Sequence, residues 1–131
     1  MQYVALLGRI LFSILFLFAS IGHFNEKTIQ YAASHGVPIP WLLVPFSGIL
    51  ALLGGLSILL GYKARIGAWL IVIFLIPVTL WMHRFWTVEN PVEAMIQQTM
   101  FYKNTALIGA ALLIAYFGSG PLSIDKNCCQ K

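Results

Sequence analysis

The stretch Y-V-A-L-L-G-R-I-L-F-S-I-L-F-L-F-A-S-I-G-H-F, from Tyr3 to Phe24, decides the class of fold. It matches the roughly 20 apolar residues that a helix needs to cross about 30 Å of hydrocarbon. Arg9 is its only charged residue. A cleaved signal peptide is disfavoured, because the positive residue lies inside the apolar run and no clear cleavage site follows it. We therefore predict a membrane-spanning helix over residues 3–24.

Three more apolar runs follow, over about residues 42–61, 66–82 and 100–117. The whole chain of 131 residues is 60% hydrophobic and 9% charged, with a mean hydropathy of +0.85. Soluble domains are about 25% charged, so this composition requires a lipid bilayer as the solvent. We predict one all-α domain over residues 1–131, an integral membrane four-helix bundle with short extramembrane helical segments and a polar tail over 118–131.

Capping residues outline the segments outside the hydrocarbon. Asn25 and Gly36 are typical first and last caps of a short helix. Asn90 followed by Pro91 predicts the start of another helix, which can run without a break to Phe117. That helix would be about 40 Å long, more than the hydrocarbon thickness, so its first turns should project beyond the apolar layer.

Small residues mark one face of the second span. Ser47, Gly48, Ala51, Gly54 and Gly55 recur at spacings of three and four. Such a face lets a neighbouring helix approach closely in a membrane. We interpret it as a packing surface.

The net charge of +4 does not indicate a nucleic-acid partner, because the eight Lys and Arg are scattered between apolar runs. Four spans place both termini on one side of the membrane. The side of the termini would carry Arg9, Lys63, Arg65, Lys126 and Lys131, and the other side Lys27, Arg84 and Lys103. The positive-inside rule then predicts a multi-pass protein of a bacterial-type inner membrane with both termini in the cytoplasm.

Polar residues gather in the stretch H-R-F-W-T-V-E-N-P-V-E-A-M-I-Q-Q-T-M-F-Y-K-N, from His83 to Asn104. In the predicted topology both ends of this stretch lie at the same depth in the membrane as the end of the first span. All three are on the side of the membrane opposite the termini. Imidazoles can move protons near neutral pH, and Arg or Lys can hold an anion or polarise a carbonyl. The candidate ligand-binding residues are His23, His83, Arg84, Trp86, Gln98, Lys103 and Asn104.

This polar group at the mouth of an apolar bundle would suit a ligand with an apolar body and a polar head, such as a quinone. An alternative stays open, in which the same side chains reach the lipid headgroups and pair with Glu26, Glu89 or Glu93. The aromatic residues near Trp86 are equally typical of an interfacial belt. No spacing supports haem ligation by two histidines, no metal site is predicted, and no catalytic residue is identified.

Two further features remain open at this level. Arg9 either extends back to the nearer interface or lies inside the bundle as a structural charge pair with Asp125. The adjacent Cys128 and Cys129 are poorly placed to bridge each other, and we expect them to belong to a solvated tail without a disulfide or metal role.

Several fragments, in this order and spacing, are typical of one known family. They are L-L-G-R (6–9), Y-A-A-S-H-G-V-P-I-P (31–40), A-L-L-G-G (51–55), G-Y-K-A-R (61–65), H-R-F-W (83–86), Q-Q with F-Y-K-N (97–104) and G-P-L-S-I-D (120–125). Over nearly its whole length the chain resembles the DoxX family of small four-helix membrane proteins.

The resemblance implies a membrane redox setting. The family is similar to the large subunit of an archaeal thiosulfate:quinone oxidoreductase, and its members are often linked to redox and thiol-stress functions. Many relatives carry a glutamate where this chain has Ala51, so Arg9 lacks that intramembrane acid and Asp125 becomes its expected counter-charge.

Two hypotheses about function follow. The first is a quinone-interacting or redox-accessory subunit of a membrane oxidoreductase system, working with a partner subunit or as a homo-oligomer. The alternative is a non-catalytic membrane scaffold or assembly partner that docks through the glycine-rich second span and the aromatic belt. The sequence does not decide whether the protein is an enzyme.

Overall fold

The computed structural model describes residues 1–125, and the expectation for Cys128 and Cys129 lies outside them. The described chain forms α1 (Gln2–Gly22), α2 (Glu26–Ser34), α3 (Pro40–Leu60), α4 (Ala64–Met82), the 3-10 helix η1 (Phe85–Thr87) and α5 (Pro91–Phe117). No strand occurs within residues 1–125. Four helices, α1, α3, α4 and α5, are long and apolar enough to cross a membrane, which confirms the predicted all-α membrane fold.

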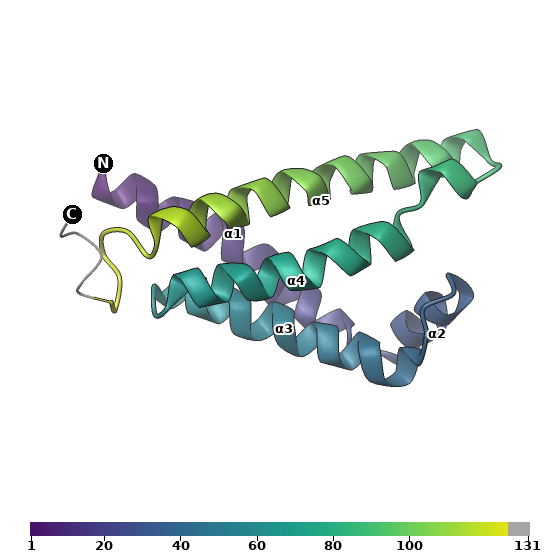
Figure 1. Cartoon of the computed structure of the whole chain (residues 1–131), viewed down its shortest axis with the longest axis horizontal. Coiled ribbons are helices and arrows are strands. Elements are labelled where there is room, and N and C mark those ends of the chain that lie inside the picture. Colours follow the sequence, from purple (N-terminus) through teal and green to yellow (C-terminus); the bar gives the residue numbers. More distant parts are fainter. Residues whose placement is uncertain (126–131) are drawn as a thin grey trace.

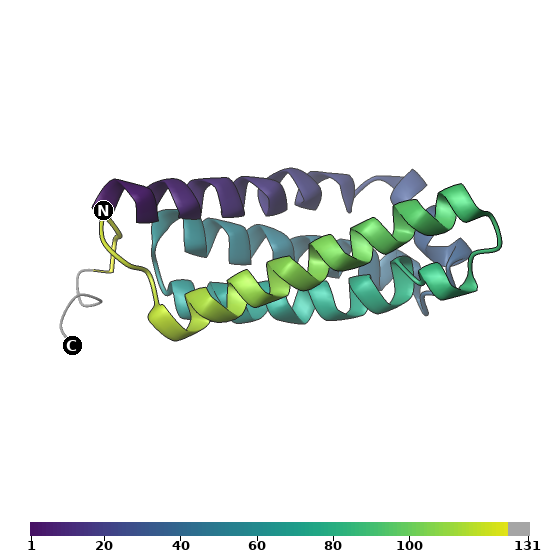
Figure 2. The ribbon, with the colours of Figure 1, turned by 90° about the horizontal axis from the view of Figure 1, so that it is seen from above.

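The spanning helices pack in the order α1, α3, α4, α5, each against the next. Figure 1 shows α5 running past the end of α4, and Figure 2 shows it crossing the other helices at an angle. The beginning of α1 and the end of α5 share one end of the bundle, which we call the terminal end. The opposite end, which holds α2, His23 and His83, is called the α2 end.

Local chemistry fixes where the helices begin and end. The Asn25 side chain accepts from the N–H of Lys27 at 3.0 Å, and Asn90 caps α5 in the same way. Gly61 ends α3 in the left-handed region, with φ of 65°. The N–H of Tyr62 then bonds back to the carbonyl of Ser57, as in a Schellman motif. The sequence predicts the first caps Asn25 and Asn90, whereas at the other end of α2 the structure places the cap at His35, with the predicted Gly36 next to it in the left-handed region at φ of 77°.

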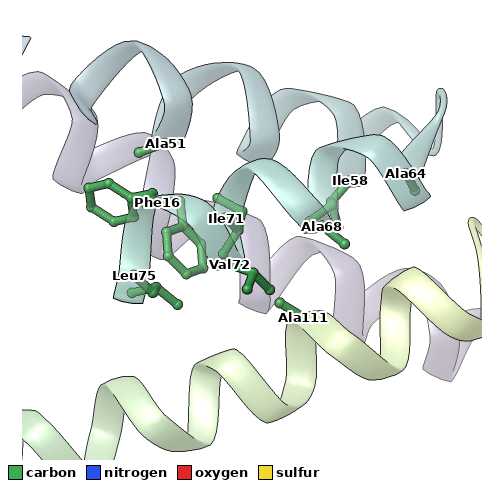
Figure 3. Close-up of a cluster of buried hydrophobic side chains, with 10 residues drawn as sticks. Phe16, Ala51, Ile58, Ala64, Ala68, Ile71, Val72, Leu75 and Ala111 are labelled. Carbon is green, nitrogen blue, oxygen red and sulfur yellow. The ribbon is translucent and has the colours of Figure 1, made fainter. Parts of the chain in front are cut away.

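The core, where α1, α3, α4 and α5 meet, combines two phenylalanines with aliphatic and small side chains. Figure 3 shows Phe16 of α1 beside Ile71 and Leu75 of α4, with Ala111 facing them from α5. The opposite faces carry exposed apolar residues, such as Phe18 at 68% and Leu113 at 61% exposure. Outward faces of this kind are matched to lipid, because soluble monomers avoid large contiguous apolar patches.

The small-residue face of α3 brings the helices close together, as predicted. A Cβ added at Gly54 would lie 2.8 Å from the backbone oxygen of Gly67 in α4. One added at Gly55 would lie 3.1 Å from Leu17 of α1. This face of α3 is therefore already covered by helices of the same chain.

Candidate functional site

A cavity of about 480 Å³ lies at the α2 end of the bundle, between α1, α2, α3 and α4. Its wall is almost entirely apolar and includes Val44, Phe46, Leu50, Phe74 and Val78. α2 contributes part of the wall through Tyr31 and Ala32. The space is within the range of about 300–1,000 Å³ that small-molecule sites usually occupy.

Two imidazoles from different helices line this cavity. His23 follows α1, and its Nδ1 lies 2.7 Å from the carbonyl oxygen of Ala19, one turn back. His83 follows α4, and its Nδ1 lies 2.7 Å from Oε1 of Gln97 in α5. The ring of His23 also packs edge-on against Phe74, with centroids 5.4 Å apart. Each ring is thus held by a hydrogen bond at Nδ1, and that of His23 also by packing.

α2 covers one side of the cavity and is fixed by a long-range hydrogen bond. It packs against α3, and Arg84, just after α4, donates to the carbonyl of His35 at 2.7 Å. His35 is the residue that caps the C-terminal end of α2. A guanidinium at that position is favourable, because the C-terminal end of a helix carries partial negative charge. Arg84 therefore holds the far end of α2.

The predicted site residues divide into separate groups. His23 and His83 meet at the cavity, and Arg84 holds α2 beside it. The other four residues are not part of the cavity wall. Trp86 is 57% exposed and packs against Phe85 and Phe101, and Gln98 donates a hydrogen bond to the Tyr102 hydroxyl. Lys103 is exposed, whereas Asn104 is buried at 3% exposure.

Gln97 holds His83, although the sequence pointed to its neighbour Gln98. The buried residues of α5 are Gln97, Asn104 and Ala111, which are seven apart. A spacing of seven keeps side chains on one face of a helix that packs against a neighbour. Counting back seven residues from Asn104 would have selected Gln97 from the sequence.

At the terminal end, Arg9 turns into the protein. It is 6% exposed and donates to the carbonyl oxygens of Ser119, at 2.9 Å, and Leu122. The Asp125 carboxylate accepts from the N–H of Lys63 at 2.6 Å and from the Ser119 hydroxyl at 3.1 Å. Both charged side chains bond to Ser119, while direct pairing between them stays a prediction. We call residues 118–125, with Arg9 and Lys63, the terminal network.

Position 51, where many relatives carry a glutamate, lies far along α3 from the residue that contacts Arg9. Ala51 is fully buried, and it lies ten residues from Gly61, the glycine that contacts Arg9. Ten residues of helix span about 15 Å, farther than an arginine and a glutamate side chain can bridge. An acid at position 51 would therefore lie far from the Arg9 guanidinium as it stands here, and Asp125 as the counter-charge of Arg9 stays a prediction.

Comparisons with known proteins agree with the architecture. Residues 4–84 match the model of the DoxX family. The chain is 28% identical to the inner membrane protein YphA of Escherichia coli over 124 residues, covering 95% of this chain and 87% of that protein. It is 34% identical to the inner membrane protein YqjF of the same organism over 128 residues, covering 96% and 92%.

A more distant relative is the ER-derived vesicles protein ERV29 of Saccharomyces cerevisiae, 26% identical over 82 residues, which cover 63% of this chain and 26% of that protein. No solved structure matches the chain. The family model covers more than half of the sequence, and the two bacterial relatives align with nearly all of it. The chain therefore belongs to the DoxX family of integral membrane proteins.

Proposed function

We propose that this protein binds a small molecule with an apolar body and a polar head, such as a quinone, in the cavity at the α2 end. In this role it serves as a quinone-interacting or redox-accessory subunit of a membrane oxidoreductase system. One observation carries the proposal. An apolar cavity in a membrane bundle is covered by α2 and has two imidazoles, His23 and His83, on its wall.

The wall suits such a ligand for a physical reason. The apolar body of the ligand replaces lipid contacts by contacts with side chains such as Leu50 and Phe74. The head group then needs polar partners, because an unpaired polar group in hydrocarbon is costly. His23 and His83 supply those partners, and an imidazole can also accept or release a proton near neutral pH.

The proposal gives the other candidate residues different roles. Arg84 acts by positioning α2 rather than by contacting the head group, because its guanidinium bonds to His35. Lys103 and Asn104 are not part of the cavity wall. Binding therefore depends on the two histidines and on the open volume beneath α2.

Binding of decylubiquinone, in its oxidised and in its reduced form, to the protein in lipid nanodiscs tests the proposal. Trp81 lines the cavity, so a bound quinone should quench its fluorescence with a saturable component above the linear quenching due to partitioning into lipid. Ser47→Phe should fill the cavity and remove the saturable component. Leu53→Phe is the matched control, because Leu53 lies on the same helix and is 52% exposed.

The site would be ruled out if the wild-type protein showed no saturable quenching. It would also be ruled out if the saturable component were still present in Ser47→Phe. If Ser47→Phe fails to fold, Val37→Trp fills the same cavity from the loop before α3. Helical content by circular dichroism identifies the variants that remain folded.

The scaffold alternative has less support. Of its two docking surfaces, the glycine-rich face of α3 is covered, because Gly54 and Gly55 pack against α4 and α1 of the same chain, whereas the aromatic belt near Trp86 is exposed. Bulky substitutions at these glycines should therefore lower stability rather than release a partner. A Gly54→Leu protein that folds with unchanged thermal stability would restore the alternative.

A further inference from the structure

The hydrogen-bonding state of His23 determines what it offers to a ligand. A carbonyl oxygen can only accept a hydrogen bond, so the 2.7 Å contact with Ala19 places the proton of the neutral ring on Nδ1. Nε2 then carries a lone pair and forms no hydrogen bond with residues 1–125. His23 therefore offers the cavity an acceptor.

His83, which follows α4 and also lines the cavity, is arranged in the same way. Its Nδ1 faces the Oε1 of Gln97 at 2.7 Å, and an amide oxygen is also only an acceptor. The neutral ring again keeps its proton on Nδ1 and leaves Nε2 as the free atom. Two helices thus bring two acceptors to one cavity.

Two further wall groups have no hydrogen to donate. The Ser47 hydroxyl already donates to the carbonyl of Val44 at 2.7 Å, which leaves its lone pairs. Pro77 has no N–H, so the carbonyl of Ile73, one turn earlier in α4, lacks its usual helical donor. Ser47, Ile73 and Pro77 all line the cavity.

Donors on the wall are fewer. The hydroxyls of Thr28 and Tyr31 can act as donor or acceptor and do not discriminate between ligands. The indole of Trp81 is the one side chain of the wall that can only donate, and Trp81 is 41% exposed. The balance on this wall favours acceptors.

The geometry points to a ligand whose head group donates hydrogen bonds, a phenol or hydroquinone hydroxyl, in preference to a quinone carbonyl or an ether. This inference rests on the proposed function and specifies its ligand as the reduced, hydroxyl-bearing form. A carbonyl or ether oxygen brought to the Nε2 of either ring would place two acceptors together without a proton between them. A hydroxyl satisfies one of them directly.

The test compares ligands that are inert to oxidation and differ only in the hydroxyl. The probes are 4-decylphenol and 4-decylanisole, with 4-decylacetophenone as the carbonyl probe. Binding to the protein in nanodiscs is measured by equilibrium dialysis at pH 8, where a free imidazole is neutral, and corrected for partitioning into empty nanodiscs. We expect the phenol to bind about tenfold more tightly than the anisole, as one hydrogen bond predicts.

Substitution of the histidines measures their contribution to the preference for the phenol. The double variant His23→Phe/His83→Phe should reduce the preference for the phenol to near onefold while keeping the apolar contacts, and each single variant should reduce it in part, because a hydroxyl donates to one imidazole at a time. His35→Phe is the matched control, because the Nδ1 of His35 also bonds to a carbonyl one turn back, at 2.9 Å from Tyr31, but His35 is not part of the wall.

The outcomes distinguish this inference from the proposed function. If the ether or the ketone binds as well as the phenol, the inference fails and the proposed function stands. If none of the three probes binds, the proposed function fails. If a histidine variant does not fold, nitrogen NMR of ¹⁵N-histidine in the wild-type protein serves instead. The Nε2 resonances of His23 and His83 should shift on addition of phenol, and unchanged resonances would overturn the inference.

Discussion

Arg84 donates a hydrogen bond of 2.7 Å to the carbonyl of His35, the residue that closes α2, across 49 positions of the chain. α2 packs otherwise against α3, so this bond is a main restraint on its far end. We predict that Arg84→Met loosens α2. Exchange of the α2 amide hydrogens should become about tenfold faster, as loss of a charged hydrogen bond predicts.

Hydrogen exchange followed by mass spectrometry of the peptide over residues 26–34 measures this effect. Arg65→Met is the control, since Arg65 is an exposed cation in the first turn of α4. Equal exchange in both variants would mean that Arg84 does not restrain α2. Faster exchange throughout the bundle would indicate general destabilisation instead.

Gln97 and Gln98 provide an adjacent pair with different predicted effects. Gln97 is 9% exposed and bonds to His83, whereas Gln98 bonds to the Tyr102 hydroxyl on the outside of α5. Gln97→Leu should free Nδ1 of His83 and move the His83 resonances in a ¹⁵N-histidine spectrum. Gln98→Leu should leave them in place, and the reverse result would contradict the assigned contact.

Substitution by alanine should lower the thermal stability at Gly61 and raise it at Gly109. Gly61 has φ of 65°, and an added Cβ would collide with the guanidinium of Arg9 and with Ser123. The left-handed backbone alone costs an alanine about 1–2 kcal/mol, so Gly61→Ala should lower the thermal midpoint in detergent. A Cβ at Gly109, in the middle of α5, meets nothing within 4 Å.

Gly109→Ala should therefore raise the midpoint slightly, by the equivalent of about 0.5–1 kcal/mol, because alanine is the better helix former. Circular dichroism melts of both variants in one detergent provide the comparison. A Gly61→Ala protein as stable as the wild type would show that Arg9 does not occupy that space.

The terminal network predicts energetic coupling between Arg9 and Asp125. Arg9→Met leaves the carbonyls of Ser119 and Leu122 without their donors, at a cost of about 1–3 kcal/mol for each. Asp125→Asn weakens the acceptor of the Ser119 hydroxyl. A double-mutant cycle on unfolding in detergent should give a coupling of about 0.5 kcal/mol or more.

The same cycle repeated in a Ser119→Ala background identifies the route of the coupling. Removal of the hydroxyl should bring the coupling toward zero, because the link to Asp125 runs through that group. Coupling that is unchanged without the hydroxyl would instead indicate a direct ion pair. Additive losses in both backgrounds would rule out either connection.

The orientation in the membrane is a separate prediction, based on the distribution of cations. Both termini are expected in the cytoplasm, with five Lys and Arg on that side against three on the other. A fluorescent protein fused after residue 131 should therefore fluoresce, and alkaline phosphatase fused there should be inactive. The opposite pattern would invert the topology, and reporters inserted in the loop before α3 give the complementary result.

Much of the fold could be predicted from the sequence because its signals are local. The run 3–24 has both the length and the hydrophobicity of a membrane span. Asn25 and Asn90 each mark the start of the helix that follows them directly in the sequence. Close packing along α3 was also predictable, because glycines at spacings of three and four serve no other purpose in a lipid-facing helix.

The candidate site was predicted less well, because it depends on rotation and on long-range contacts. His23 and His83 were placed together by topology alone. Lys103 was chosen for its depth, but depth does not tell which way a side chain on α5 faces. The cavity beneath α2 could not be predicted, since it results from the angle at which a short helix crosses α3. The Arg84 bond to His35 joins segments 49 positions apart and leaves no local pattern.

The terminal network also has a consequence for the direction of access. It closes the bundle where Arg9 and Lys63 bind the returning chain, while the cavity lies at the opposite end. A ligand bound as we propose would therefore enter from the leaflet at the α2 end, and the direction in which the protein is inserted would decide to which membrane surface that leaflet belongs.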